Sequence, residues 1–523
     1  MGCGSTKEQE EKNVPRKVAL QNERLIGNKG SHGKLVDNTG GKYKSIEDNT
    51  LQVTKGRLVG YFNENCEEAY KFIKILGEGA FGKVYLVEHR KTNEKFACKR
   101  ISKKKIRDIK TLNQEISLMK QLDHPNTVKL YEVYEDKTYI FLIMEELKGG
   151  ELFDRILDRA KANNYYSERQ VARLFRQVIS GIAYCHEMKI VHRDIKPENI
   201  IFVDSSEDSR LKLIDFGLST IFDNSKEKSM TTKIGTCFYM SPEVIKGDYT
   251  EKCDIWALGV LLYILVSGRP PFSGENDNIT MNKILTGKFE FKWEGWKQIS
   301  QELKDLISSM LTLDVENRPS ANDLLENKWL NDNQYELSET EMDKTIALKI
   351  NFADVKKYVE MNKFSQAISA FIALRLNEES IKGLSQIFTK IDKNGNGTIS
   401  IEEFKVGMDN YCKTQGISIP EDKRDMIFKA ADLDHNESIT YNEFITATYE
   451  RKKNNIKEIA YQAFKTFDYD RNGVISFEEF QNLITSNSEE DKKSLLKLFV
   501  EIDKNGNGSI EFDELMENLG EGY

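Results

Sequence analysis

At residues 191–199 the chain reads Val191-His192-Arg193-Asp194-Ile195-Lys196-Pro197-Glu198-Asn199, and this stretch decides the fold. It places a carboxylate, an ammonium and a carboxamide at fixed offsets, each suited to a separate part of phosphoryl transfer. Asp194 can orient a hydroxyl nucleophile and accept its proton, while Lys196 can steady the transferring phosphoryl group. Asn199 offers a carboxamide oxygen to Mg2+, which prefers oxygen ligands. The first three letters alone arise by chance in charged loops, but the spacing to Asn199 is much rarer.

A second motif, Asp215-Phe216-Gly217, supplies another carboxylate for Mg2+, so Asn199 and Asp215 form the predicted metal pair. Ser241-Pro242-Glu243 then closes the segment that follows.

Upstream, residues 77–84 read Gly77-Glu78-Gly79-Ala80-Phe81-Gly82-Lys83-Val84, a loop in which missing side chains let backbone N–H groups approach phosphates. Alone this pattern is weak, and a dinucleotide-binding fold is its rival. A strand ending in Lys99 follows, and then a helical stretch that carries Glu115. Lys99 could therefore hold phosphates while Glu115 holds Lys99, although Glu115 could also be a solvated helix charge. The order along the chain favours the first interpretation.

Together these motifs resemble a protein kinase. The resemblance implies an α+β, bilobal fold with Met144 at the back of the adenine pocket and a hinge that begins at Glu145. The nucleotide-binding residues that it implies are Leu76, Gly77, Gly79, Gly82, Val84, Ala97, Lys99 and Glu145. Glu151 and Glu198 resemble the carboxylates that grip an arginine upstream of the acceptor Ser or Thr, where bidentate pairing favours Arg over Lys. Both could instead be ordinary surface charges. Arg318 resembles the residue that anchors a glutamate such as Glu243 in the large lobe of protein kinases, and the resemblance implies a structural role for it.

Four twelve-residue loops with acids at both ends occupy the C-terminal part of the chain. Their spacing matches EF-hand calcium loops, in which position seven contributes its backbone carbonyl. The predicted ligands are Asp392, Asn394, Asn396, Thr398 and Glu403; Asp432, Asp434, Asn436, Ser438 and Glu443; Asp468, Asp470, Asn472, Val474 and Glu479; and Asp503, Asn505, Asn507, Ser509 and Glu514. Ile399 with Ile439, and Ile475 with Ile510, should pair the hands through short strands. One such loop could be a solvated turn, but four in tandem predict an all-α calmodulin-like domain.

The second hand is predicted to be the weak one. Its position six is Glu437, where the other three hands have glycine. The chain turns there with positive φ, which costs a residue with a Cβ on the order of 1 kcal/mol or more. Alternatively, pairing with the first hand enforces the turn regardless.

Between the kinase motifs and the hands, residues 352–376 carry apolar side chains at helical spacing beside Lys356 and Lys357. A basic amphipathic helix next to calcium loops is a plausible calmodulin-type target. The alternative is a helix that merely caps the kinase lobe.

The N-terminus, Met1 to Thr6, matches the N-myristoylation pattern at Gly2, and Cys3 could take a palmitoyl chain. One acyl chain holds a protein to a membrane only marginally, so the second matters. An unmodified start is the alternative. Residues 7–66 have little apolar periodicity and predict a mostly disordered extension, with docking of Tyr61 and Phe62 left open.

Composition excludes other classes. The net charge of -8 argues against a nucleic-acid partner, and seven scattered cysteines indicate reduced thiols in a cytosolic setting. The longest apolar run, Trp256 to Val266, is too short to span a bilayer and predicts a buried helix.

The order of these segments resembles the calcium-dependent protein kinase family of plants and alveolate protists. The expected boundaries are an acylated extension at 1–66, a kinase domain at 67–330, a junction at 331–379 and a calmodulin-like domain at 380–523. The resemblance implies a monomeric Ser/Thr kinase that uses ATP, Mg2+ and Ca2+ and acts on protein substrates with upstream basic residues. It also implies a cytoplasmic location, with peripheral attachment to the inner face of the plasma membrane or to another membrane.

By the same resemblance, the junction holds the kinase inactive at low calcium, by blocking the substrate site or by restraining the lobes. A membrane-anchored calcium sensor with weak or no kinase activity is the main alternative, but Lys99, Asp194 and Asp215 are all present. A calcium buffer is the other alternative, and it would need no kinase domain.

Overall fold

The structure is a computed structural model. It describes residues 55–78, 82–105, 109–215, 220–221, 237–247, 250–333, 355, 358–359, 361–376, 378–415, 418–449, 456–484 and 489–519. The predicted acylation sites Gly2 and Cys3, the loop residue Gly79, and Lys356 and Lys357 of the junction lie outside these ranges.

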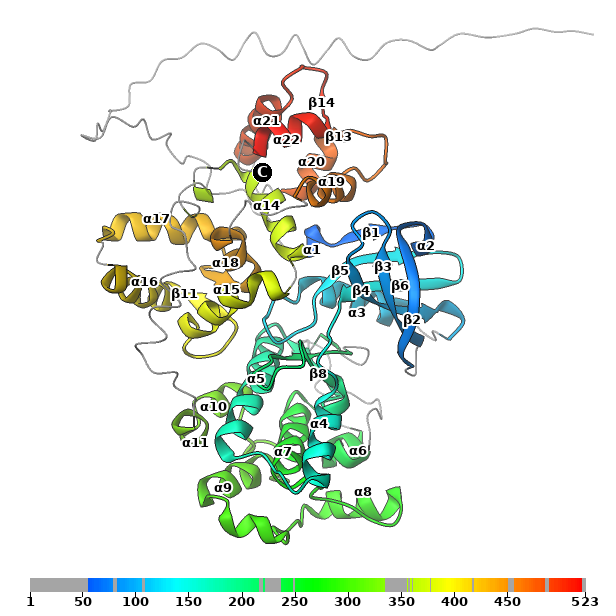
Figure 1. Ribbon diagram of the computed structural model, residues 1–523, viewed down its shortest axis with the longest axis vertical. Coiled ribbons are helices and arrows are strands. Elements are labelled where there is room, and N and C mark those ends of the chain that lie inside the picture. Colours follow the sequence, from blue (N-terminus) through cyan, green and yellow to red (C-terminus); the bar gives the residue numbers. More distant parts are fainter. Residues whose placement is uncertain are drawn as a thin grey trace, which may run out of the picture. The chain divides into compact units, whose positions relative to one another are not determined.

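The expected small lobe is built on one sheet, in which the described residues form six strands in the order β1-β5-β6-β4-β3-β2 (Figure 1). The strands are β1 (Gly60–Phe62), β2 (Tyr70–Glu78), β3 (Gly82–His89), β4 (Lys95–Ser102), β5 (Leu130–Glu135) and β6 (Tyr139–Glu145). β1 pairs parallel to β5, and every other neighbour in the sheet pairs antiparallel. Helix α3 (Ile109–Gln121) follows β4, so the predicted order of Lys99 and Glu115 is confirmed at the level of elements.

The end of the expected disordered extension is folded. Helix α1 (Lys55–Leu58), β1 and α2 (Cys66–Ala69) all precede or span the predicted boundary at residue 67. Leu58 and Cys66 are buried, and the ring of Phe62 lies 4.9 Å from that of Tyr134. Tyr61 donates a hydrogen bond to Glu135. The sheet edge at β5 gives this segment hydrogen-bond partners, so the docking that the sequence left open does occur.

The large lobe is helical around α7 (Lys252–Ser267). Every residue of α7 from Cys253 to Ser267 is buried, so the predicted buried helix at residues 256–266 is confirmed. The other helices are α4 (Leu152–Lys161), α5 (Glu168–Glu187), α6 (Pro242–Lys246), α8 (Asp277–Thr286), α9 (Gln301–Met310), α10 (Ala321–Leu325) and α11 (Lys328–Asp332). Ser167 and Gln170 form a capping box that starts α5.

Two small two-stranded sheets flank the site residues of the large lobe in sequence, since Asp194 follows β7, Asn199 precedes β8 and Asp215 follows β9. β7 (Ile190–Val191) pairs with β10 (Thr220–Ile221), and β8 (Ile200–Phe202) pairs with β9 (Leu211–Leu213). No helix in the described ranges is long and apolar enough to cross a membrane.

The described residues between 378 and 519, the calcium-binding part of the chain, form eight helices and two short two-stranded sheets. The helices are α15 (Glu378–Ile391), α16 (Ile401–Gln415), α17 (Glu421–Ala431), α18 (Tyr441–Thr448), α19 (Ile456–Phe467), α20 (Phe477–Leu483), α21 (Glu489–Ile502) and α22 (Phe512–Leu519). The sheets join β11 (Thr398–Ser400) to β12 (Ser438–Thr440) and β13 (Ile475–Ser476) to β14 (Ser509–Ile510). Ile399 faces Ile439 and Ile475 faces Ile510, as predicted.

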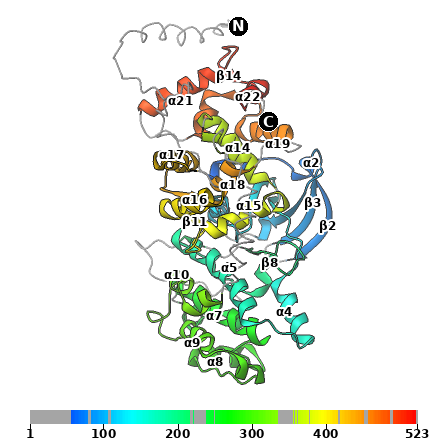
Figure 2. The same cartoon turned by 60° about the vertical axis from the view of Figure 1, so that its left-hand side comes forward.

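The junction forms helix α14 (Lys363–Arg375), which contacts α18 and α19; Figure 2 shows α14 beside α18. All residues from Phe364 to Arg375 are buried. The predicted amphipathic helix is therefore covered on every side, and each of Ser365, Gln366, Ser369 and Arg375 makes at least one side-chain hydrogen bond. Ser365, for example, donates to the side chain of Asn518 across 2.6 Å. Burial of polar groups is tolerated because they find such partners.

Candidate active site and calcium sites

The catalytic loop brings three predicted residues together. The carboxylate of Asp194 accepts hydrogen bonds from Lys196 Nζ at 2.7 Å and from Asn199 Nδ2 at 2.8 Å. Asn199 sits in a short 3-10 turn that begins at Pro197, whose fixed φ suits the first position of such a turn. A base, a cation and a magnesium ligand are therefore held within one hydrogen-bonded group.

Asp254, in the first turn of α7, fixes this loop from behind. Its carboxylate accepts the backbone N–H groups of His192 and Arg193, at 2.9 and 2.8 Å, and lies 2.9 Å from His186 Nε2. Although burial raises the pKa of Asp254, the hydrogen bonds and nearby histidine charge hold it below its ordinary value. Arg193 is held at φ +68, a conformation that such anchoring can enforce. Asp254 therefore positions the catalytic loop, a role that depends on contacts between residues about 60 positions apart.

Lys99 on β4 meets the predicted magnesium ligand Asp215. Lys99 Nζ lies 2.6 Å from Asp215 Oδ1. Glu115 lies in α3 as predicted, and its side chain falls outside the described parts of the structure. Asn199 and Asp215 together offer carboxamide and carboxylate oxygens, the donors that suit Mg2+. These residues therefore fit magnesium and the phosphates of ATP.

The remaining nucleotide residues lie on the strands expected of them. Leu76 and Gly77 are on β2, Gly82 and Val84 on β3, and Ala97 on β4. A Cβ on Gly77 would meet nothing within 4 Å, which leaves its backbone open to a phosphate. A Cβ on Gly82 would lie 1.9 Å from the carbonyl oxygen of Arg100, so Gly82 is required first for the approach of β3 to β4.

The side chain of Glu145 is engaged away from the nucleotide. It is 4% exposed, and its carboxylate accepts the N–H of Lys129 at 2.6 Å and pairs with Lys212 Nζ at 2.7 Å. The predicted nucleotide contact of Glu145 is thus confined to its backbone, because its carboxylate stabilises the hinge instead. The position of a hinge residue in the sequence does not reveal whether its side chain or only its backbone is available to contact the nucleotide.

Glu151 and Glu198 lie near each other, as a shared arginine site requires. Burial, followed by the charges of Asp154 and Glu198, raises the pKa of Glu151. Glu198 Oε2 is buried without a hydrogen-bond partner among the described residues. A carboxylate in this condition favours a guanidinium ligand, so the geometry is compatible with the predicted substrate site.

The predicted anchor in the large lobe is confirmed. Arg318 is 1% exposed and donates to both oxygens of Glu243, at 2.5 and 3.2 Å. This bidentate pair holds the segment that follows the active site to the lobe.

The four calcium loops are preformed. In each loop the carboxylate at position one accepts the N–H of position six, at 2.9, 3.1, 3.0 and 2.8 Å in chain order. The glutamate at position twelve accepts N–H groups from the start of the same loop, as Glu403 does from Lys393 at 3.0 Å. Carboxylate oxygens of hands two and three gather within 4.8 Å of one another. This donor set of carboxylates, amides and carbonyls fits Ca2+.

Crowding of acids marks the loops as cation sites. Burial and Asp434 raise the pKa of Glu443 to about 8. Burial and Asp432 raise the pKa of Asp434 to about 6, and burial raises the pKa of Asp392 to about 7. A divalent cation relieves such repulsion when it binds.

The backbone of hand two is strained where the sequence predicts it. Glu437 has φ +65, in the left-handed region that glycine occupies in the other hands. A second strained position was missed: position four is His435 in hand two and Arg471 in hand three, with φ of +55 and +59. Hands one and four have Gly395 and Gly506 at that position, and this difference in residue type was the available signal.

A bilobal fold with this catalytic loop and four EF-hand loops defines a calcium-binding protein kinase. The protein kinase domain model matches residues 70–330, and the EF-hand domain pair model matches residues 381–449 and 457–519. Calcium-dependent protein kinase 4 of Plasmodium berghei is 39% identical and covers 96% of this chain and 97% of its own length. Calcium-dependent protein kinase 17 of Arabidopsis thaliana is 35% identical, over 90% of this chain and 87% of its own. The chain belongs to the calcium-dependent protein kinase family.

The enzyme is accordingly a calcium-activated Ser/Thr protein kinase that uses ATP and Mg2+ and binds Ca2+. The alternative of a sensor scaffold with weak or no kinase activity is not favoured, since the relatives are named calcium-dependent protein kinases and Lys99, Asp194 and Asp215 are all present.

Proposed function

We propose that calcium controls this kinase by capturing helix α14 of the junction. The observation that supports this is the complete burial of α14 between residues 364 and 375, against helices α18 and α19 of the calcium-binding part. Without calcium the hands release α14, which then restrains the kinase. In the described arrangement α14 is occupied by the hands, and the structure therefore resembles the released state.

The test is phosphorylation of a basic Ser peptide, with calcium and with chelator, by the full chain and by a chain ending after Asn333. The full chain should respond to calcium, and the shortened chain should be indifferent to it. A shortened chain that still responds would exclude control through the junction.

In the transfer itself, this chain supplies orientation and charge. Asp194 accepts the hydroxyl proton of the substrate, and Lys196, held 2.7 Å away, balances the charge that develops. ATP, when bound, supplies the phosphoryl group, and Mg2+ neutralises part of the negative charge of its phosphates. Lys99 would position the phosphates, while Asn199 and Asp215 would hold the metal.

The substrates that we propose are proteins with an arginine three positions before the acceptor. Support comes from the proximity of Glu151 to Glu198 and from an oxygen of Glu198 that is buried and has no hydrogen-bond partner in the part of the chain that the structure describes. Two carboxylates that share a site favour a bidentate cation over a neutral residue.

Attachment to the cytoplasmic face of the plasma membrane or of another membrane is proposed to need both Gly2 and Cys3, because one acyl chain gives only marginal binding. Fractionation of Gly2→Ala and Cys3→Ser variants tests this, and retention of both variants on membranes would refute it. We propose that the enzyme works as a monomer, which light scattering of the purified full chain would check.

A further inference from the structure

We infer that the kinase domain reads the first calcium loop directly, through His124, Ser180 and Arg176. This inference rests on the proposed calcium control and specifies which loop transmits it. The three residues form a receptor for the backbone of the first hand, residues 392–403. We call them the loop receptor. His124 follows α3, and Arg176 and Ser180 lie on α5.

A chain of hydrogen bonds with fixed polarity joins the kinase to the loop. His124 Nδ1 accepts the N–H of Asn126 at 3.0 Å, which places the ring proton on Nε2. Nε2 lies 3.1 Å from Ser180 Oγ, so the imidazole donates to the hydroxyl. Ser180 in turn donates to the carbonyl oxygen of Gly395, at position four of the loop. Only a loop that turns this carbonyl toward α5 completes the chain.

Arg176 contacts a second carbonyl of the same loop. Its Nη2 donates to the carbonyl oxygen of Lys393 at 3.2 Å, while its Nη1 lies 3.0 Å from Asn331 Oδ1. The charge of Asp392, the first calcium ligand, acts on Arg176 against the effect of burial on its pKa. The receptor therefore touches the loop backbone at positions two and four, between its ligand side chains.

Gly397 shows how closely the two surfaces meet. A Cβ on Gly397 would lie 1.9 Å from His124 Cδ2 and 2.5 Å from Nε2. Gly473 and Gly508 hold the same position in hands three and four, and a Cβ on either would meet nothing within 4 Å. Gly397 is buried, whereas Gly473 and Gly508 are exposed. A close approach at position six is thus a property of hand one that hands three and four do not share, although Arg471 of hand three pairs with Glu64 elsewhere on its loop.

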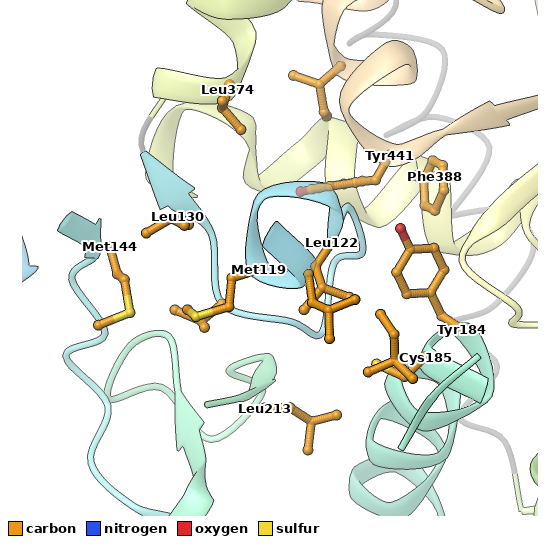
Figure 3. Close-up of a cluster of buried hydrophobic side chains, with 14 of the residues drawn as sticks. Met119, Leu122, Leu130, Met144, Tyr184, Cys185, Leu213, Leu374, Phe388 and Tyr441 are labelled. Carbon is orange, nitrogen blue, oxygen red and sulfur yellow. The ribbon is translucent and has the colours of Figure 1, made fainter. Parts of the chain in front are cut away.

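The second hand contacts Asp123, the residue that precedes His124 of the loop receptor. Asn442, at position eleven of its loop, donates its N–H to Asp123 Oδ2 at 2.8 Å, and the N–H of Asp123 donates to Tyr184 at 2.9 Å. Figure 3 shows Tyr184 and Leu122 of the kinase facing Phe388 and Tyr441 of the first pair of hands. The loops of the first two hands therefore both contact residues 123–124, which follow α3, the helix that carries Glu115.

Calcium sets the direction of the loop carbonyls, because the loop wraps around the ion. A receptor that fits only the wrapped loop binds the calcium form preferentially, and by thermodynamic reciprocity it also tightens calcium at hand one. Hand one should therefore be the hand whose occupancy the catalytic machinery detects most directly.

The test compares Gly397→Ala with Gly508→Ala in the full chain. The two glycines have φ of +86 and +83, so an alanine strains both loops alike, but only Gly397→Ala collides with the loop receptor. At saturating calcium, Gly397→Ala should lose at least tenfold in maximal activity, while Gly508→Ala should keep its maximum and shift only its calcium midpoint. Equal behaviour of the two variants would overturn the inference.

Ser180→Ala provides a second test of the loop receptor, and this small substitution should not disturb the fold. It removes one hydrogen bond to the loop and should raise the calcium concentration for half-maximal activation by about fivefold, the scale of one net hydrogen bond. Activity at zero calcium and thermal unfolding in chelator should match the unaltered chain. An unchanged midpoint in Ser180→Ala would also overturn the inference. A failure of the unaltered chain to respond to calcium would instead refute the proposed control.

Discussion

Arg375, in the last turn of the junction helix α14, forms a buried ion pair with Glu132 of strand β5. Arg375 Nη2 lies 2.7 Å from Glu132 Oε1, and the two side chains are 3% and 6% exposed. Glu132 also accepts the hydroxyl of Tyr70 at 2.7 Å. Burial raises the pKa of Glu132, but Arg375 and Tyr70 more than offset it, so the carboxylate stays ionised.

Arg375→Met should therefore weaken the attachment of α14 to the kinase. Removing one partner of a buried pair costs about 3–5 kcal/mol because the other charge is left buried alone. We expect lower calcium-stimulated activity and a lower unfolding temperature in calcium. Lys297→Met, which removes an exposed pair with Glu294, is the control and should change neither. Unaltered calcium stimulation in Arg375→Met would contradict this role.

Asp194→Asn should abolish transfer and leave ATP binding nearly intact, because it removes the base without removing a nucleotide contact. Loss of a general base typically costs 10²–10⁴-fold in rate. Steady-state kinetics and nucleotide binding by fluorescence would measure the two effects separately. Glu302→Gln, at an exposed position of α9, is the matched control. Near-normal turnover in Asp194→Asn would disprove the assignment.

Glu151→Gln and Glu198→Gln should each reduce the preference for a peptide with arginine three positions before the acceptor. The rate with an alanine peptide should stay unchanged, because that peptide makes no contact with the carboxylates. A peptide array with paired Arg and Ala sequences would measure the ratio. If the ratio is the same in both variants and in the unaltered enzyme, the two acids are ordinary surface charges.

Calcium binding should release protons between about pH 6 and pH 8. The window follows from the raised pKa values of Asp434, Asp392 and Glu443, at about 6, 7 and 8. In the calcium-free fold these acids hold protons that the unfolded chain has already lost, so their burial destabilises that fold as pH rises. Calcium binds the ionised form, and its affinity should therefore increase from pH 6 to pH 8. Calorimetry in buffers of different ionisation enthalpy would count the protons, and a heat independent of buffer would refute this.

Glu437→Gly should tighten the weakest calcium site. It removes a Cβ from a residue at φ +65, which relieves on the order of 1 kcal/mol, or somewhat less than tenfold in affinity. Calcium titration of the full chain would resolve the weakest step. Gly473→Ala, the reverse change in hand three, should weaken its own site by a similar factor. An unchanged weakest step in Glu437→Gly would show that pairing with hand one enforces the turn.

The sequence predicted those parts of the site whose chemistry is local. Asp194, Lys196 and Asn199 occupy fixed offsets in one loop, and the calcium ligands repeat within twelve residues, so spacing alone reveals them. The positive φ of Glu437 was predictable for the same reason, since one residue type stands where glycine is required.

Relationships across the chain were not predictable in this way. Ser180 meets Gly395 only because two separate elements fold against each other, and neither residue type is unusual where it stands. Strand β1 has three residues, too few for a period, and it is ordered by the free edge of β5. The carboxylate of Glu145 turned out to be structural because Lys212, far along the chain, lies opposite it.

That last pair has a pharmacological consequence. Lys212 is fully buried and also lies 2.9 Å from Glu378, in the first turn of α15, while Arg210 pairs with the same Glu378. A continuous line of charges thus runs from the hinge behind the adenine pocket to the first helix of the calcium-binding part. If calcium controls whether Glu378 pairs with Lys212, we expect an inhibitor seated against the hinge to bind with different affinity in calcium and in chelator. Inhibitor screens should therefore be run under both conditions.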